Sequence, residues 1–208
     1  MKKRSYFLIF FLSVIGFLLI ITTSFFNNKT KEVKTLKNSK ILIVYYSRTG
    51  NTKTVAELIQ GKVGGDLEQI ETKETRPSNY KEEVEQNEIE QNQNILPKLK
   101  NKIENFDSYD TIFIGAPTWN MGLPQAVVSF LKDYNFNNKD VIPFNTNGGY
   151  GPGNSFSQIK SEARGANIKE GFSVKGGEEN KDILLSIKGE KREKVLKEVD
   201  LWLKKVLN

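Results

Sequence analysis

Short polar side chains follow directly on an apolar run near the start of the chain. Residues 41–46 read Ile-Leu-Ile-Val-Tyr-Tyr, and residues 47–52 read Ser-Arg-Thr-Gly-Asn-Thr. An unbroken apolar run of this length is typical of a parallel strand that is covered on both faces. Hydroxyl groups and the unpaired N–H groups of a helix start can surround phosphate oxygens, and Gly50 permits a positive φ. This stretch therefore predicts an anion cradle suited to a phosphate monoester.

Two other phosphate-binding patterns are absent from this stretch. The dinucleotide fingerprint needs Gly-x-Gly-x-x-Gly, but Gly50 is the only glycine at this position. A nucleoside triphosphate loop needs Gly-x-x-x-x-Gly-Lys-Ser/Thr, and around Gly61 the chain has Ala56 in place of the first glycine and Val63 in place of the hydroxyl. An ordinary turn from strand to helix, with Thr52 as the helix cap, stays open as an alternative.

The composition limits the chemistry of the side chains. The 208 residues include no cysteine and no histidine. Disulfides, iron–sulfur ligation, a thiol nucleophile and any acid–base or metal chemistry of imidazole are therefore excluded. We expect neither a catalytic side chain nor a metal site, so that any reaction must be carried by a bound group.

The elements that position the cradle alternate along the chain between strands and helices. Strands are predicted at 41–46, 67–71, 111–115, 141–144 and 168–174, and helices at 54–62, at 123–134 and over the stripe of Val195, Val199, Trp202, Leu203 and Val206. Right-handed crossovers then give a parallel sheet with helices on both faces. The sequence predicts a five-stranded, doubly wound α/β domain.

The charged segment 72–106 carries two helical signals. Tyr80 and Val84 lie one turn apart, and Leu96, Leu99, Ile103 and Phe106 follow at spacings of 3, 4 and 3, with Pro97 near the start. We predict a helix at each place. The run of Glu, Gln and Asn over 82–94 is interpreted as the solvated face of a helix.

Two further loops are expected at the same sheet edge as the cradle, because ligands of such sheets lie outside the carboxyl ends of the strands. The loop after 111–115 offers Trp119 as a flat wall, and residues 145–153 contain four glycines beside Tyr150. Together the three loops suit a flat, phosphorylated ligand.

With these residues the sequence resembles the flavodoxin family, in the branch whose first loop reads Ser-Arg-Thr-Gly-Asn-Thr. The resemblance covers roughly residues 40–208. It includes Gly115-Ala116-Pro117, Trp119, Asp133-Tyr134, Ile142-Pro143-Phe144 and Trp202-Leu203. It implies a sheet with strand order 2-1-3-4-5. One departure is Asn120, which stands where the branch often has a second Trp.

The resemblance implies flavin mononucleotide (FMN) as the cofactor, with the first loop on the phosphate and the other two loops beside the isoalloxazine ring. The residues that it assigns to FMN are Ser47, Arg48, Thr49, Gly50, Asn51, Thr52, Pro117, Thr118, Trp119, Asn120, Gly122, Asn147, Gly148, Gly149 and Tyr150. The function implied first is electron transfer to a redox partner protein or a small-molecule acceptor. An FMN-dependent NAD(P)H:quinone-type oxidoreductase is the main alternative, and a membrane-tethered binding module without redox turnover is a further one.

The three loops also predict how a flavin would behave in the site. Residues 47–52, 116–124 and 145–153 contain no Asp or Glu, and Arg48 is their only formal charge. Reduced flavin tends to be anionic, so carboxylates close by would lower the second reduction potential. We expect the two one-electron potentials to lie close together, which suits a two-electron reductase as well as a carrier.

The first 39 residues differ from the rest of the chain. Residues 6–26 are apolar apart from Ser13 and the Thr-Thr-Ser run at 22–24, and about 20 such residues span a bilayer. Lys2, Lys3 and Arg4 precede them and favour a cytoplasmic N-terminus. We predict that residues 1–26 are a basic head and a single-pass anchor, 27–39 a linker, and 40–208 an extracytoplasmic domain at the cell membrane. Secretion after cleavage of a signal peptide is the alternative.

The net charge gives no reason to expect a nucleic-acid partner. Without the three basic residues of the head, 28 Lys and Arg face 25 Asp and Glu, which leaves about +3. The predicted partners are therefore a redox partner or electron acceptor, and the membrane through residues 6–26.

Overall fold

The computed structural model describes residues 40–178, 181 and 183–207. The predicted anchor at 6–26 and the linker at 27–39 lie outside the described residues. Within the described ranges, none of the helices combines the length and the apolar character that crossing a membrane requires.

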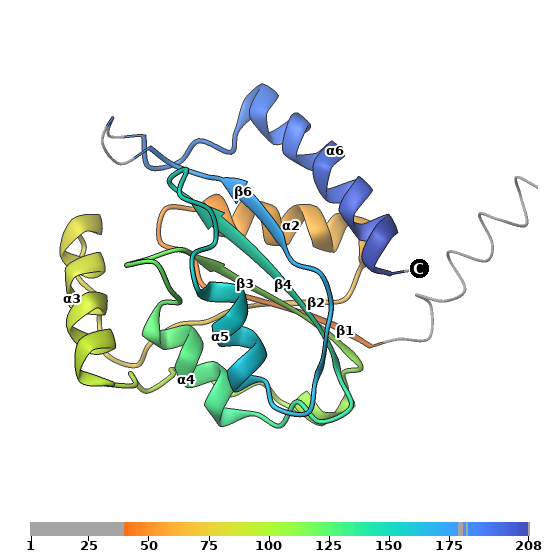
Figure 1. Cartoon of the computed structure of the whole chain (residues 1–208), viewed down its shortest axis with the longest axis horizontal. Coiled ribbons are helices and arrows are strands. Elements are labelled where there is room, and N and C mark those ends of the chain that lie inside the picture. Colours follow the sequence, from red (N-terminus) through yellow and green to blue (C-terminus); the bar gives the residue numbers. More distant parts are fainter. Residues whose placement is uncertain (1–39, 179–180, 182, 208) are drawn as a thin grey trace, which may run out of the picture. The chain divides into compact units, whose positions relative to one another are not determined.

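The core of the domain is a parallel sheet (Figure 1). Five strands form its main path: β1 (Ile41–Tyr45), β2 (Asp66–Gln69), β3 (Thr111–Pro117), β4 (Asp140–Asn147) and β5 (Asn167–Ile168). The strand order is β2-β1-β3-β4-β5, and every pair is parallel. The doubly wound α/β fold with this strand order is confirmed.

The single strand predicted at 168–174 is wrong. Two short strands replace it, β5 and β6 (Phe172–Lys175), and both pair with β4, so the sheet has six strands among the described residues. The break falls at Gly171, where a Cβ atom would lie 2.7 Å from a ring atom of Phe156. A side chain at this position would force the Phe156 ring to move, and a glycine at a close approach of this kind weakens a strand.

Helices cover both faces of the sheet, as Figure 1 shows. On one face lie α2 (Asn51–Val63) and α6 (Gly189–Val206), and on the other lie α4 (Gln125–Asp133) and α5 (Ser155–Glu162). The sequence pattern does not predict α5. On the α6 side, Trp202 contacts the rings of Phe113 and Phe172, with centroids 6.0 and 5.3 Å apart.

The helix predicted over residues 96–106 is wrong. This segment is extended and irregular, and it ends in a short 3-10 helix, η1 (Phe106–Ser108). Thr72 and Leu99 form an antiparallel bridge, and the N–H of Lys100 donates to the carbonyl of Glu71 at 2.8 Å. Leu99 and Ile103 still pack against the core. Their spacing therefore reflected burial, which an extended segment can also provide.

The helix predicted around Tyr80 is present as α3 (Tyr80–Gln93). The prediction that its polar run is a solvated face is correct for Glu82, Glu85 and Glu88, which are exposed, and wrong for the opposite face of the helix. Glu83, Asn87 and Glu90 have exposed fractions of only 2%, 2% and 6%. They are buried because they make hydrogen bonds or ion pairs with neighbouring residues, which offsets the cost of their desolvation.

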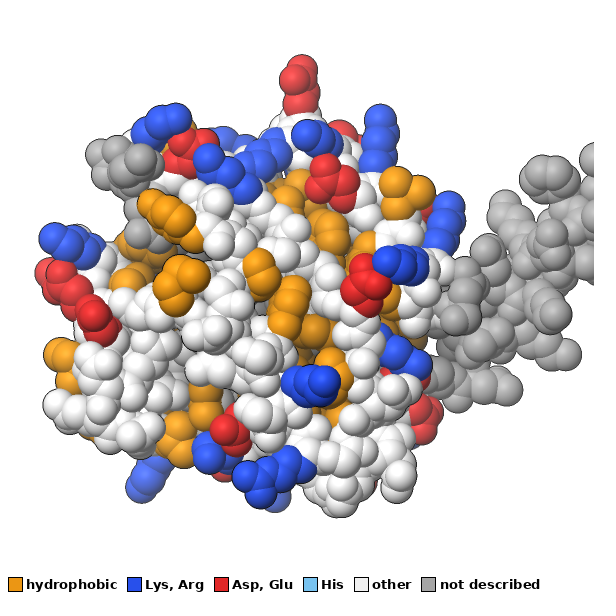
Figure 2. All heavy atoms as spheres, in the orientation of Figure 1, with side chains coloured by type: hydrophobic (Ala, Val, Ile, Leu, Met, Phe, Trp, Pro, Cys, Tyr) orange, Lys and Arg blue, Asp and Glu red, His pale blue; other side chains and the backbone are white. Residues whose placement is uncertain are grey.

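Charged side chains of both signs are interspersed on the face of the molecule drawn in Figure 2. This mixture agrees with a chain whose formal net charge is only +6 at neutral pH. Apolar side chains are visible between the charged ones on this face.

Candidate functional site

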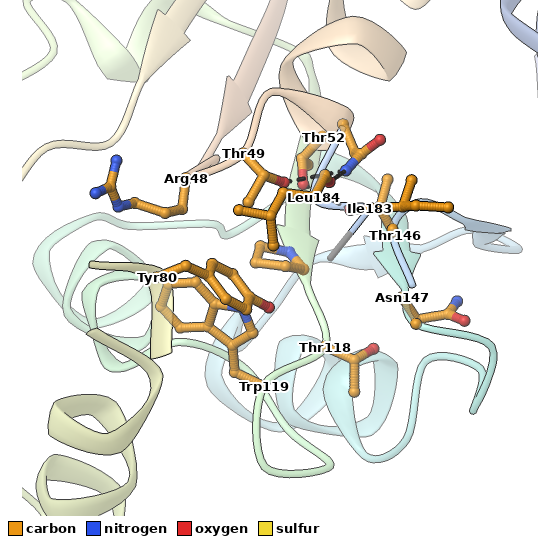
Figure 3. A pocket seen from close by; sticks show the side chains of 14 residues that line it. Arg48, Thr49, Thr52, Tyr80, Thr118, Trp119, Thr146, Asn147, Ile183 and Leu184 are labelled. Atoms are coloured by element: carbon orange, nitrogen blue, oxygen red, sulfur yellow. Dashed lines mark hydrogen bonds between the residues drawn. The ribbon is translucent and has the colours of Figure 1, made fainter. Parts of the chain in front are cut away.

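Three loops at the carboxyl ends of β1, β3 and β4 meet around one pocket (Figure 3). Nine of the residues predicted to bind the ligand line it: Arg48, Thr49, Asn51, Thr52, Pro117, Thr118, Trp119, Asn147 and Gly148. Tyr80, Thr146, Gly177, Ile183 and Leu184 complete the lining. The fold therefore brings together residues that are up to 136 positions apart in the sequence, as Arg48 and Leu184 are.

The first loop presents hydrogen-bond donors at the start of α2. Gly50 is the N-cap residue with φ of 92°, and no side chain caps the helix. The hydroxyl oxygen of Ser47 is buried without a hydrogen-bond partner among the described residues. Unpaired groups of this kind are costly in a protein interior unless a ligand or water satisfies them. This end of α2 can therefore hold an anion.

Thr49 of the first loop keeps a hydroxyl hydrogen for the pocket, and so does one member of the pair Thr52 and Thr146. Thr49 Oγ1 accepts a hydrogen bond from the side-chain amide of Asn51 at 3.0 Å, so its own hydrogen can be donated elsewhere. Thr52 Oγ1 and Thr146 Oγ1 lie 2.8 Å apart. One of these hydroxyls donates to the other, and the acceptor can donate its own hydrogen to a ligand.

Asn51 has a different role from the one expected. Its side-chain amide donates to the carbonyl of Leu184 at 2.5 Å, and its oxygen accepts the backbone N–H groups of Ser186 and Ile187. The side chain therefore binds the segment before α6. The group of Asn51 that can still donate to a phosphate is its backbone N–H.

An aromatic cluster forms the wall of the second loop. Trp119 has an exposed fraction of 3%, and its ring makes edge contacts with Tyr46 and Tyr80 at centroid distances of 5.6 and 6.0 Å. Figure 3 shows Tyr80 and Trp119 together on one side of the pocket, opposite Thr118 and Asn147. Burial and a hydrogen bond to Glu83 raise the pKa of the Tyr46 phenol.

A tight turn follows Trp119. The N–H of Trp119 donates to the carbonyl of Gly122 at 3.0 Å, and the reverse bond is 2.9 Å long. Asn120 and Met121 both have positive φ, 50° and 59°. Asn tolerates this backbone region well, but for Met it is uncommon. The turn is held from α3, because Asn87 donates to the side-chain oxygen of Asn120 at 3.3 Å.

The third loop is organised by Asn147. Its side-chain oxygen accepts the N–H groups of Gly149 and Gly151 at 2.8 and 3.1 Å. Beneath it, the fully buried Asn145 donates to the carbonyl of Ala116 and to Thr118 Oγ1 at 3.0 and 2.9 Å. These amides connect the second loop to the third.

Several predicted site residues lie outside the lining of the pocket. They are Ser47, Gly50, Asn120, Gly122, Gly149 and Tyr150, and Tyr150 has an exposed fraction of 82%. Thr146 lines the pocket but is absent from the predicted set. It lies within residues 145–153, which the sequence analysis places at the ligand, so its position in that loop could have identified it. Tyr80, Ile183 and Leu184 reach the pocket only through tertiary folding.

The chain belongs to the flavodoxin family, whose family model matches residues 40–187. A flavodoxin of Synechocystis sp. is 32% identical over 110 residues, which are 51% of this chain and 51% of that flavodoxin. A flavodoxin of Nostoc sp. is 28% identical over 144 residues, or 67% of each chain. The match thus spans about half the length of the Synechocystis protein.

Two crystal structures share the fold. A Bacteroides eggerthii protein assigned as a flavoprotein superimposes with a TM-score of 0.65 at 30% identity, over 82% of this chain and 99% of its own. A flavoprotein of Lactobacillus acidophilus in complex with FMN superimposes with a TM-score of 0.55 at 25% identity, over 65% of this chain and 92% of its own.

Proposed function

We propose that this protein is a flavoprotein that binds FMN non-covalently in the three-loop pocket and transfers electrons between redox partners. The observation that carries the proposal is the uncapped start of α2, beside the buried and unpartnered Ser47 hydroxyl, at a pocket with an aromatic wall. The membership in the flavodoxin family and the FMN complex of the Lactobacillus relative support it.

The residues present fit such a cofactor. The Thr49 and Thr52 hydroxyls, which line the pocket, and the first N–H groups of α2 would hold the phosphate, with the buried Ser47 hydroxyl as a further donor from the same loop. Trp119 and Tyr80 would lie beside the ring. FMN supplies the redox chemistry when it is bound, because no side chain of this chain can do so. The protein binds the flavin, orients it and limits the access of water.

The binding test compares wild-type protein with the double variant Thr49→Ala/Thr52→Ala, using the full-length chain in mild detergent. FMN is titrated and the quenching of its fluorescence is followed. Each hydrogen bond to a charged phosphate is worth about 1.5–3 kcal/mol. We expect the double variant to bind FMN at least about tenfold more weakly, since 1.4 kcal/mol corresponds to a factor of ten. Unchanged affinity would place the phosphate elsewhere.

A matched control comes from the same helix. Thr54 Oγ1 donates to the carbonyl of Gly50 at 3.0 Å, and Thr54 does not line the pocket. The variant Thr54→Ala removes one threonine hydroxyl near the loop without removing a group assigned to the phosphate. We expect its FMN affinity to stay close to that of wild type.

The FMN-dependent NAD(P)H:quinone-type oxidoreductase remains the second candidate, because the three loops contain no carboxylate that would hold the flavin to one-electron steps. Oxidation of NAD(P)H by the purified holoprotein, without any added reductase, would favour the enzyme. A holoprotein that is reduced only by a partner reductase would favour the carrier.

We also propose that residues 6–26 tether the domain to the cell membrane with the domain on the extracytoplasmic side. The proposal rests on the length of the apolar run and on the basic residues before it. The redox partner would then be a protein or a small-molecule acceptor on that side of the membrane.

A further inference from the structure

A buried carboxylate of α3 holds the first loop from behind. The side chain of Glu83 has an exposed fraction of 2%. One of its oxygens accepts a hydrogen bond from the hydroxyl of Tyr46 at 2.5 Å, and the other forms an ion pair with Nε of Arg48. Tyr46 and Arg48 are the two neighbours of Ser47. Glu83 therefore fixes the backbone on both sides of the unpartnered Ser47 hydroxyl.

The guanidinium of Arg48 is committed away from the pocket. Besides its contact with Glu83, its Nη2 donates to the carbonyls of Pro77 and Ser78, with the bond to Pro77 at 3.3 Å. Figure 3 shows Arg48 extending away from Thr49 and from the lining on the Asn147 side. Two of the three guanidinium nitrogens are thus used by the segment before α3 and by α3 itself.

The pair cancels the only formal charge of the three loops. Arg48 is the only charged residue in 47–52, 116–124 and 145–153, and Glu83 is the carboxylate that touches it. A carboxylate that is this deeply buried is strongly unfavourable without its partner. If Arg48 were neutral, Glu83 would place an unpaired negative charge behind a loop that has to accept an anion.

Resting on the proposed function, we propose that Glu83 is a positioning residue for the phosphate loop and that Arg48 serves to balance Glu83 rather than to bind the phosphate. The phosphate is then held by hydroxyl and backbone donors in a loop without net charge. Arg48 acts on the ligand through the carboxylate it neutralises and the loop it holds.

A double-variant cycle separates this role from direct binding. The variants Arg48→Gln, Glu83→Gln and Arg48→Gln/Glu83→Gln are prepared as full-length protein in detergent. Each is titrated with FMN and with riboflavin, which has the same ring and no phosphate. The ratio of the two dissociation constants reports on the phosphate loop, and general damage to the fold does not change this ratio selectively.

We expect Arg48→Gln to reduce the preference for FMN over riboflavin about tenfold or more, because it exposes the phosphate to the unpaired Glu83 carboxylate. We expect the double variant to recover a preference within about threefold of wild type, because removing both charges restores the neutral loop. A double variant as weak as Arg48→Gln would show that Arg48 binds the phosphate directly, and would overturn the inference.

The chain offers a matched control pair about two helical turns along α3 from Glu83. Glu90 of α3 is also buried, and its carboxylate pairs with Arg76 at 2.5 Å, but neither residue lines the pocket. The variant Arg76→Gln/Glu90→Gln removes a similar pair from the same helix, and its FMN preference should match that of wild type. A change in preference as large as that of Arg48→Gln would contradict a specific role of Glu83.

If the neutral variants fold poorly, the variant Arg48→Lys still tests the proposal, because it keeps a positive charge beside Glu83. Because the positive charge is retained, its preference for FMN should stay within about threefold of wild type. A tenfold loss in this variant would count against charge balance as the role of Arg48. Wild-type protein that binds neither flavin would overturn the proposed function, and the inference with it, whereas wild-type binding without recovery in the cycle overturns the inference alone.

Discussion

The side-chain oxygen of Asn51, in the first turn of α2, accepts a hydrogen bond from the backbone N–H of Ile187 at 3.1 Å. The same oxygen accepts from Ser186 at 3.0 Å, and Asn51 has an exposed fraction of 4%. Residues 184–188 form neither helix nor strand, so this amide supplies partners that a regular element would otherwise provide. It thereby holds the segment that brings Ile183 and Leu184 to the pocket.

Replacing Asn51 by Ala should lower the free energy of unfolding by about 2–3 kcal/mol, because two backbone N–H groups and one carbonyl lose their partner in a largely buried place. Urea unfolding of the full-length protein, followed by tryptophan fluorescence, measures this loss. The exposed Asn101 provides the control, and Asn101→Ala should stay within about 0.5 kcal/mol of wild type. Equal stability of both variants would show that the segment is held by other contacts.

The pH dependence of stability should depend in part on Glu178. Its carboxylate pairs with Lys175 at 2.8 Å and with Lys181 at 2.7 Å. These hydrogen bonds and charges lower the pKa of Glu178 to about 2, from 4.5. A lowered pKa in the folded state means that the carboxylate stabilises the fold above about pH 4.5, and that this contribution is lost as the pH falls toward 2.

The variant Glu178→Gln tests the direction of this pH dependence of stability. We expect it to be slightly less stable than wild type at pH 7, and the difference to shrink steadily between pH 4.5 and pH 2. Urea titrations over this range give the difference at each pH. Glu104, which is exposed, provides the control, and Glu104→Gln should show a smaller dependence. A difference that grows on acidification would contradict the assignment.

The position of the domain relative to the membrane can be tested on intact cells. If residues 6–26 stay in the bilayer with a cytoplasmic N-terminus, protease added outside should digest the domain once the cell wall has been opened. A cytoplasmic protein followed in the same sample serves as the control for sealed membranes. Full protection of the domain would reverse the orientation, and a soluble chain beginning near Phe25 would reveal a cleaved signal peptide.

The sequence predicted the sheet well because its strands are continuous apolar runs. Residues 41–45 and 111–114 are buried throughout, as the lack of alternation indicated. The prediction over 96–106 was wrong because helical spacing of apolar residues also arises in an irregular segment that turns toward the core. Pro97 and the alternation of Lys98, Leu99 and Lys100 favour the extended bridge that forms.

The part of the candidate site that sequence reasoning missed comes from α3 and from the segment before α6. Glu83 lies in a run of acids and amides that is typical of a solvated helix, and its burial depends on Tyr46 and Arg48, which are more than 30 positions away. Leu184 reaches the pocket because Asn51 binds its carbonyl. Pairings of this kind between distant residues have no local pattern.

The charge of the three loops affects the reduction potentials of a bound flavin. Carboxylates are absent from 47–52, 116–124 and 145–153, and the buried carboxylate of Glu83, which contacts the first loop, is paired with Arg48. The carbonyl of Met121 accepts from the N–H of Asn154 at 2.8 Å, and a Cβ atom on Gly153 would lie 2.5 Å from it. The Met121 carbonyl is thus held toward α5, so a rotation of this peptide would break a hydrogen bond in a crowded place.

The three loops carry no carboxylate that would repel an anionic reduced flavin, and the hydrogen bond from Asn154 restrains the Met121 carbonyl from turning toward the flavin. We therefore expect the two one-electron potentials of the bound FMN to lie close together. A spectroelectrochemical titration of the holoprotein measures both. Asn120→Asp, which adds a carboxylate to the second loop, should lower the second potential and separate the two, whereas Asn101→Asp, at an exposed position outside the pocket lining, should leave them unchanged. A wild-type protein whose second potential is already strongly depressed would contradict the charge argument and would identify a one-electron carrier.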